Sequence, residues 1–239
     1  MSIKLHVQSN TLRTFMNYYP SLPNEYPMKK LLLSTVILSS TLAIHITHTR
    51  LEVICGPMFA GKSEELIRRL HRIGIAQRSH NQEHHVLVVK PMLDSRGATN
   101  VISSHNGNTY DALAIQSPQD LLDLVAAGNY EVIAIDEVQF FSHDIIDVIR
   151  TLVVQGKRVI VAGLDLDYRS EPFGPIAAIL ALADSVTKLQ AICTQCGEDA
   201  CRSQRIINGK PARYSDPIIM IGAEEAYQAR CKKCYSILP

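Results

Sequence analysis

The sequence predicts an α/β fold built on a mostly parallel sheet with flanking helices, and two observations support this. From Leu51 onward, short β-branched runs alternate with segments of helical period, as in successive β-α-β units. A glycine-containing string, Gly56–Ser63, lies between the first such run and the first helical segment. That position is typical of a phosphate-binding loop. The fold class we expect is therefore P-loop NTPase-like, followed by a small cysteine-bearing module.

Strands and helices alternate through residues 49–191, which we assign to the core. The strand candidates are apolar through most of their length, as in a parallel sheet covered on both faces. One helix candidate, near the amino-terminal end of the core, carries apolar side chains on one stripe at steps of four and three residues, and two others end just before a glycine. The expected strands are Leu51–Cys55, Val86–Lys90, Val132–Asp136, Arg158–Gly163 and Val186–Ile192. The expected helices are Ser63–Gln77, Gln119–Ala127, Asp144–Gln155 and Pro175–Asp184, the last apolar enough to be well buried.

Composition indicates one well-filled domain with a small appendage. Of the 239 residues, 46% are hydrophobic and 20% are charged, which is ordinary for a globular protein. The 24 Lys and Arg residues nearly balance 23 Asp and Glu residues, for a formal net charge of +1. Proteins that hold long nucleic acids usually carry a strong basic excess. We therefore expect no nucleic-acid partner.

Residues 1–48 precede the regular pattern and are expected to be a disordered or loosely packed extension, or the result of an upstream start codon. Within them, residues 28–46 read MKKLLLSTVILSSTLAIHI, which is similar to the basic start and apolar middle of a secretory signal. This stretch begins well inside the chain and is shorter than the roughly 20 apolar residues of a membrane-spanning helix. We expect neither export nor a membrane partner.

Residues Gly56–Ser63 read GPMFAGKS and match G-x-x-x-x-G-K-[ST] in full. Glycines let backbone N–H groups approach phosphate oxygens, and the N-terminus of the following helix adds a favourable dipole. Lys62 supplies a positive charge for the β- and γ-phosphates of ATP, and the Ser63 hydroxyl can help to hold Mg²⁺. The motif therefore predicts binding of a nucleoside triphosphate.

Asp136 and Glu137 follow the apolar run VIAI, at the carboxyl end of an expected strand. Open α/β sheets bind their ligands at this end. Asp136 is the candidate for the Mg²⁺ side of the site, and Glu137 is the candidate for a general base that accepts a hydroxyl proton. An ATPase would use such a glutamate to activate water, so the acid pair alone does not separate a kinase from an ATPase.

The cysteines indicate a metal site rather than a disulfide framework. The strings Cys193-Thr-Gln-Cys196 and Cys231-Lys-Lys-Cys234 are two C-x-x-C pairs, which together suit a closed, structural Cys₄ site for Zn²⁺. A redox function would need only one pair. Reduced, metal-binding thiols in a chain with a P-loop favour the cytoplasm. We expect residues 192–239 to form a zinc-anchored module.

These strings resemble, in order, those of the type II thymidine kinase family. They are GPMFAGKS, KPMLDSR, DEVQFF and DLDYRSEPFG, followed by C-x-x-C and a late Y-x-x-x-C-x-x-C. The resemblance runs from about Leu51 to Cys234, and its first and third strings together are more specific than a P-loop alone. It implies transfer of the γ-phosphate of ATP to the 5′-hydroxyl of thymidine, in deoxynucleoside salvage. It also implies a homotetramer or homodimer.

The resemblance further implies a role for each matching residue. Glu137 would be the base on the 5′-hydroxyl, and a zinc-anchored loop, the lasso, would grip thymine largely through backbone groups. ATP and Mg²⁺ would be bound by Gly56, Pro57, Met58, Phe59, Ala60, Gly61, Lys62, Ser63, Asp94, Arg96 and Asp136, with Gln139 orienting groups near the acceptor. Thymidine would be bound by Met58, Phe140, Tyr168, Phe173, Ser203, Ile218, Ile219, Met220, Ile221, Gly222 and Tyr227.

Two positions depart from the family pattern. Tyr168 stands where the family often has phenylalanine, which adds a hydroxyl, and Ser203 stands where the family tends to carry a threonine that contacts the base. Another deoxynucleoside remains an alternative substrate, because a lasso that reads the base through its backbone does not reveal specificity in its side chains.

A zinc-containing P-loop ATPase that acts on nucleic acid is the alternative from a different class. It predicts basic and aromatic residues gathered on one surface. The near-neutral charge and the DEVQFF string argue against it, and a purely structural zinc protein would leave the P-loop unexplained. The basic residues of the cysteine module that favour this alternative are Arg202, Arg205, Lys210, Arg213, Lys232 and Lys233.

Overall fold

The computed structural model describes residues 50–79, 85–93, 100–104, 106–219 and 226–239, all within one compact unit, His48–Pro239. The extension predicted for residues 1–48, with its signal-like stretch, lies outside these residues. In the part of the chain that is described, no helix is both long enough and apolar enough to cross a membrane. Five predicted site residues also lie outside the described part: Asp94, Arg96, Met220, Ile221 and Gly222.

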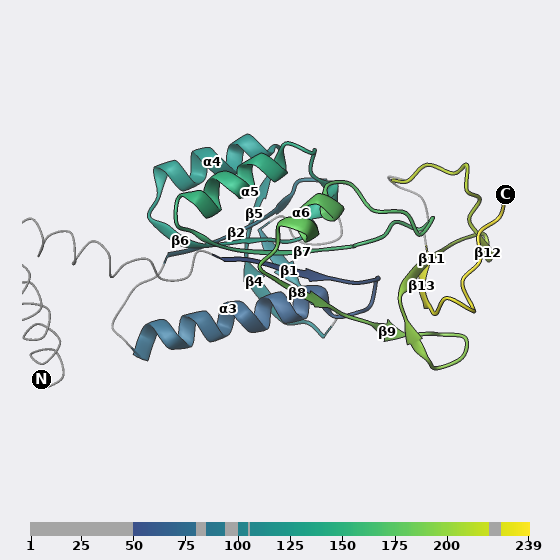
Figure 1. The fold of residues 1–239 in the computed structure, drawn as a ribbon. Helices are drawn as coiled ribbons and strands as arrows, with labels where there is room; N and C mark the ends of the chain where they lie inside the picture. The colour runs from purple at the N-terminus through teal and green to yellow at the C-terminus, as the bar shows by residue number, and fades with distance from the viewer. Residues whose placement is uncertain (1–49, 80–84, 94–99, 105, 220–225) are drawn as a thin grey trace, which may run out of the picture. The chain divides into compact units, whose positions relative to one another are not determined.

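A six-stranded sheet forms the core, and all of its pairings are parallel, in the order β5-β2-β6-β7-β1-β8 (Figure 1). The prediction of a mostly parallel sheet is confirmed. In this register Val53 lies between Val161 on one neighbouring strand and Val186 on the other. The strands are β1 (Arg50–Cys55), β2 (His85–Pro91), β5 (Leu113–Ile115), β6 (Tyr130–Ile135), β7 (Arg158–Gly163) and β8 (Ser185–Lys188).

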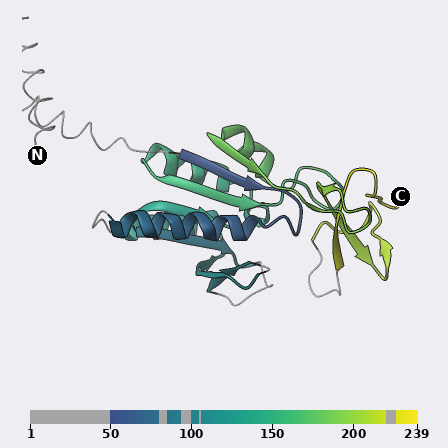
Figure 2. The same cartoon turned by 90° about the horizontal axis from the view of Figure 1, so that it is seen from below.

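Helices cover both faces of this sheet, with α3 on one side and α4, α5 and α6 on the other (Figures 1 and 2). Val53 and Cys55 belong to the apolar cluster shared with α4, α5 and α6, whereas Ile54 belongs to the cluster shared with α3. Successive side chains of a strand point to opposite faces, so both faces must be apolar where both are covered. The helices are α3 (Lys62–Ser79), α4 (Pro118–Ala127), α5 (Ile145–Val154) and α6 (Ile176–Leu182).

Helix α4 begins where its sequence signals place it. The backbone N–H of Asp120 donates to the Ser117 hydroxyl at 3.3 Å, and the Asp120 carboxylate accepts from the Ser117 N–H at 2.9 Å. This reciprocal pair is a capping box. Pro118 occupies the first turn, where its missing N–H has no cost, and Gly128 follows the last turn.

Helix α6 is less buried than its composition predicts. Only Ile176 and Ile179 are buried, and Leu182 is 38% exposed. The expectation of a well-buried helix was wrong, because this short helix contacts the sheet through one face and leaves the rest of its apolar surface outward.

The predicted strand Val186–Ile192 is divided into two strands. Its first part, in β8, pairs with β1 as far as Lys188, which lies beside Cys55. The N–H of Leu189 still donates to the Cys55 carbonyl at 2.7 Å, and β1 then ends. Beyond that point the central sheet offers no partner, so Ala191–Ile192 (β9) pairs with β10 in a separate two-stranded sheet.

Several short strands were not predicted. A hairpin of β3 (Val101–Ser103) and β4 (Thr109–Asp111) lies on the α3 side of the core. A short 3₁₀ helix, η2 (Val138–Phe140), was also not predicted, and it directly follows the acid pair. Beyond β9, the chain forms β10 (Asp199–Ala200), β11 (Arg202–Ile207), β12 (Lys210–Pro211) and β13 (Ala226–Arg230), the last three in a small antiparallel sheet.

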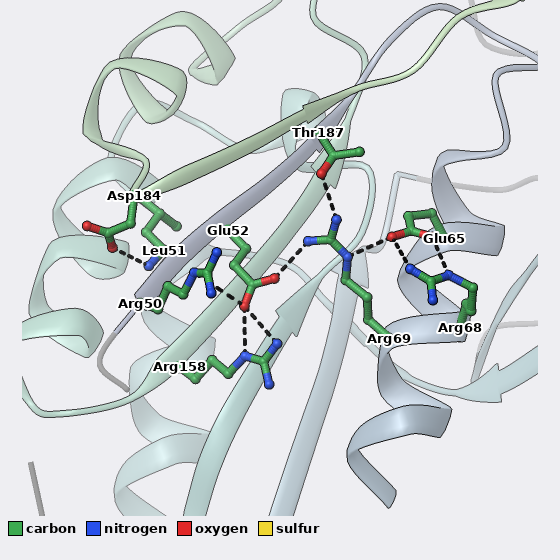
Figure 3. Close-up of polar contacts among 9 residues, drawn as sticks. All are labelled: Arg50, Leu51, Glu52, Glu65, Arg68, Arg69, Arg158, Asp184 and Thr187. Atoms are coloured by element: carbon green, nitrogen blue, oxygen red, sulfur yellow. Dashed lines mark hydrogen bonds and ion pairs between the residues drawn. The ribbon is translucent and has the colours of Figure 1, made fainter. Parts of the chain in front are cut away.

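A buried carboxylate links α3 to the sheet (Figure 3). Glu52 on β1 is 4% exposed, and its two oxygens accept from Arg69 of α3 and Arg158 of β7, each at 2.7 Å. Arg69 also donates to Glu65 at 2.9 Å and to the Thr187 hydroxyl at 2.7 Å. Buried charges are tolerated only when they are paired and hydrogen-bonded in this way.

We expect Glu52→Ala to lower the free energy of unfolding by roughly 3 kcal/mol, because it leaves two arginines beside the sheet without their shared carboxylate. Chemical denaturation measures this. The matched control is Asp147→Ala, which breaks the exposed Asp147–Arg150 pair and should cost under about 0.5 kcal/mol. Equal effects of the two substitutions would contradict a structural role for the Glu52 network.

Candidate functional site

A cavity of about 760 Å³ lies beside the carboxyl ends of β1, β2, β6 and β7. Its walls come from the loop after β1, from the acid pair after β6 and from the β3–β4 hairpin. The site thus forms at the edge where parallel α/β sheets bind ligands. The predicted site residues that it brings together are Met58, Phe59, Gly61, Lys62, Ser63, Asp136 and Glu137.

The loop after β1 needs glycine for a close approach at Gly56 and for a positive φ at Gly61. Gly56 has φ +146°, and a Cβ there would lie 2.4 Å from the carbonyl oxygen of Leu189. Gly61 has φ +78°, and its carbonyl accepts the N–H of Glu65 at 2.9 Å as α3 begins. The Lys62 ammonium donates to the Pro57 carbonyl at 2.8 Å, so its charge is held over the loop in which phosphates would bind.

Ser63 and Asp136 meet across the sheet. The Ser63 hydroxyl donates to the Asp136 carboxylate at 3.0 Å, although β1 and β6 are separated by β7. Burial, reinforced by the charge of Glu137, raises the pKa of Asp136 to about 7. A hydroxyl and a carboxylate are the hard oxygen ligands that Mg²⁺ takes, and a bound divalent cation would favour the ionised acid. The two side chains fit a magnesium site.

Glu137 has an unusual backbone conformation, and its side chain contacts a buried neighbour. Its φ and ψ are 50° and 40°, a left-handed conformation that costs a non-glycine residue about 1 kcal/mol or more. The Gln139 amide donates to the Glu137 carboxylate and, through its own oxygen, accepts the N–H of Leu164 at 3.0 Å. Gln139 is 3% exposed, and a Cβ at Gly163 would lie 2.5 Å from its amide oxygen. Gln139 therefore fixes the direction of the Glu137 side chain.

The cavity also contains residues that sequence reasoning missed. Lys90, at the end of β2, is 2% exposed and brings a second lysine to the cavity. The hairpin is fastened to α3 by the Asn106 amide, which donates to the Glu64 carboxylate at 2.8 and 2.9 Å. The position of Lys90 at the end of an apolar strand could have indicated its place at the cavity. The Asn106-Gly107 pair between β-branched runs favours a hairpin and could have predicted that element. The hairpin residues on the cavity wall are Val101, Ile102, Ser103, Ser104 and Asn106.

The predicted thymidine contacts lie beyond the lining of this cavity in the described part of the chain, except Met58. Phe140 and Phe173 pack edge to face, with ring centroids 5.6 Å apart. The Ser203 hydroxyl accepts the Met58 N–H at 3.0 Å, which joins the phosphate loop to β11. Ile218 and Ile219 are 39% and 42% exposed.

The two remaining predicted contacts are tyrosines beside a buried arginine. Tyr168 is 3% exposed, and its ring centroid lies 4.1 Å from the guanidinium carbon of Arg205. The Tyr227 hydroxyl accepts from Arg205 at 2.8 Å. Arg205 itself is 1% exposed, although it is one of the basic residues of the cysteine module that favour a nucleic-acid surface.

Four cysteines converge in the carboxyl-terminal module. The sulfurs of Cys193, Cys196, Cys231 and Cys234 all lie within 4.8 Å of one another, and none is in a disulfide. Each pair sits in a tight turn: the N–H of Gly197 donates to the Cys193 carbonyl at 2.9 Å, and the N–H of Tyr235 donates to the Cys231 carbonyl at 3.0 Å.

The spacing of these sulfurs fits a tetrahedral zinc ion. A Zn–S distance of about 2.3 Å places the sulfurs of such a site about 3.8 Å apart. The Cys196 and Cys231 sulfurs are 3.7 Å apart. Cys201 is not part of the cluster.

Two comparisons with known proteins bear on the chain. A solved structure described as a crystal structure of a DNA replication initiation factor aligns with 12% identity and a TM-score of 0.33. That alignment covers 70% of this chain, which spans only 48% of the other. The family model for thymidine kinase matches residues 49–235, a range that holds both the cavity and the cysteine cluster. The chain therefore belongs to the thymidine kinase family.

Proposed function

We propose that this enzyme transfers the γ-phosphate of ATP to the 5′-hydroxyl of thymidine, giving thymidine 5′-monophosphate for DNA precursor synthesis. One observation carries the proposal. The phosphate loop, through Lys62 and Ser63, and the acid pair Asp136–Glu137 line a single cavity, in a chain of the thymidine kinase family.

The loop of residues 56–63 would bind the phosphates of ATP. ATP phosphates lie against residues 56–63, and Lys62 brings a positive charge to the β- and γ-phosphates. Ser63 and Asp136 would hold Mg²⁺, which, when bound, neutralises charge on those phosphates. Asp94 and Arg96 are proposed to lie near the same groups. Positioning and charge stabilisation supply most of the acceleration in phosphoryl transfer.

Glu137 would act as the general base on the acceptor hydroxyl. Its carboxylate accepts the proton of the 5′-hydroxyl while the 5′ oxygen forms a bond to the γ-phosphorus. The bond between that phosphorus and the β,γ-bridging oxygen breaks, and ADP leaves. The contact with Gln139 fixes the carboxylate, so little reorganisation is needed at the moment of transfer.

Residues 192–239 are proposed to close over the nucleoside as a lid anchored by Zn²⁺ on the four cysteines. Thymine would then lie against the Phe140–Phe173 pair and the backbone of residues 218–222. The enzyme is proposed to act in the cytoplasm as a homotetramer or homodimer.

The test is phosphate transfer from labelled ATP to thymidine, with deoxycytidine, deoxyadenosine and single-stranded DNA in parallel reactions. Label in thymidine monophosphate alone is the expected result. Label in the monophosphate of another nucleoside would show that this nucleoside, and not thymidine, is the substrate. ATP hydrolysis that rises only with DNA would indicate the nucleic-acid ATPase instead, although the burial of Arg205 removes one charge from the surface that such an enzyme needs.

Replacing Lys62 by alanine should lower kcat for the nucleoside by roughly 10²- to 10³-fold, the usual effect of losing one charge-stabilising donor. The control is Lys157→Ala, at the amino-terminal side of β7 and away from the cavity lining, which should retain wild-type rates. Initial rates at saturating ATP and nucleoside measure both. Normal turnover in Lys62→Ala would place ATP elsewhere on the molecule.

A further inference from the structure

Residues 213–218, here called the strap, follow β12 and contain no regular strand or helix, only one isolated bridge between Arg213 and Leu238. The backbone of the strap is held instead by side chains from other parts of the fold. Its carbonyl oxygens accept hydrogen bonds from two arginines and a tyrosine.

Arg205 holds the far end of the strap. From β11 its two terminal nitrogens donate to the carbonyls of Pro217 and Ile218, each at 2.5 Å, while Nε donates to the Tyr227 hydroxyl. Its guanidinium lies over the ring of Tyr168. A guanidinium is a rigid planar fork of donors, so burial between two tyrosines fixes the positions of both carbonyls.

Tyr168 holds the middle of the strap through the hydroxyl that distinguishes it from phenylalanine. This hydroxyl donates to the Asp216 carbonyl at 2.5 Å and accepts from Arg169 Nε at 3.1 Å. Arg169 donates to the same Asp216 carbonyl at 2.7 Å. The turn after β7 and the strap are thereby joined at one backbone oxygen.

We propose that Arg205 and the Tyr168 hydroxyl are positioning residues for nucleoside binding, which act by ordering the strap before the substrate arrives. The proposal rests on the proposed function, in which the backbone of Ile218, at the end of the strap, contacts the base. Ordering a loop on binding costs conformational entropy. A strap already held by side-chain donors avoids that cost, so loss of a donor weakens nucleoside binding without touching the ATP site.

The test compares Tyr168→Phe with the wild-type enzyme by hydrogen–deuterium exchange of peptides covering the strap. Loss of one neutral hydrogen bond should speed strap exchange by roughly 2- to 12-fold. The KM for the nucleoside should rise by up to the same factor, because only the ordered strap binds, while the KM for ATP stays constant. Arg205→Lys, which cannot reproduce the planar fork, should produce a larger change of the same kind.

Tyr130→Phe is the matched control, since this half-buried tyrosine lies on β6 and away from the strap; its strap exchange should equal that of the wild type. Unchanged strap exchange in Tyr168→Phe overturns the proposal. Faster exchange with an unchanged nucleoside KM overturns the role in binding. If the wild-type enzyme phosphorylates no nucleoside, the proposed function fails, and the exchange measurement still decides whether the donors order the strap.

Discussion

Replacing Glu137 by glutamine should lower kcat for nucleoside phosphorylation by roughly 10³-fold, within the range of a lost general base. Glutamine keeps the shape of glutamate and retains an oxygen that can accept from the Gln139 amide. The substitution therefore removes the basic carboxylate while leaving the side chain in place. ATP binding, measured by titration calorimetry, should change little, because the phosphate loop is untouched.

The control for this substitution is Glu131→Gln, which lies at the amino end of β6, the strand that leads into the acid pair. It should retain wild-type kcat. Burial is the main cause of the raised pKa of Asp136, and the charge of Glu137 is the second cause. Glu137→Gln removes that charge, so it should bring the pKa of Asp136 below about 7 in the metal-free protein. Near-normal turnover in Glu137→Gln would show that another group accepts the 5′ proton.

Removing zinc should unfold the zinc-anchored module, residues 192–239, and abolish nucleoside phosphorylation. Among the described residues, the apolar cluster of this module consists of Ala191, Cys193, Ala200, Ala229 and Cys231, none of which is a large aliphatic or aromatic residue. Two of its five members are proposed ligands. Such a core buries too little apolar surface to hold short strands together, whereas structural zinc contributes about 10–16 kcal/mol of apparent binding free energy in small domains.

Metal analysis should find one zinc ion per wild-type chain and a large loss in Cys231→Ser. Hydrogen exchange should show that protection disappears from residues 192–239 on chelation, while the central sheet stays protected by its own two apolar clusters. Cys201→Ser is the matched control, because this cysteine lies in the same module outside the cluster. A chelated enzyme that keeps its protection in this module would contradict a structural metal.

The sequence alone determined the parts of the fold that depend on local chemistry. Alternating β-branched runs and helical periods predicted the parallel sheet. The spacing of Gly56, Gly61 and Lys62 predicted the phosphate loop, because a tight loop before a helix needs those residue types whatever surrounds it. The paired cysteines predicted one cluster for the same reason: a tetrahedral metal site accepts few spacings.

Only the tertiary structure decided which distant residues meet. The strand order, with β7 between β1 and β6, places the Ser63 hydroxyl 3.0 Å from Asp136, and no local pattern encodes strand order. Arg205 is one of the basic residues that favour the nucleic-acid alternative, yet it is 1% exposed, because burial depends on partners that come from the strap and from the turn after β7. Hydrogen bonds and burial act between segments remote in sequence, and only the folded chain brings those segments together.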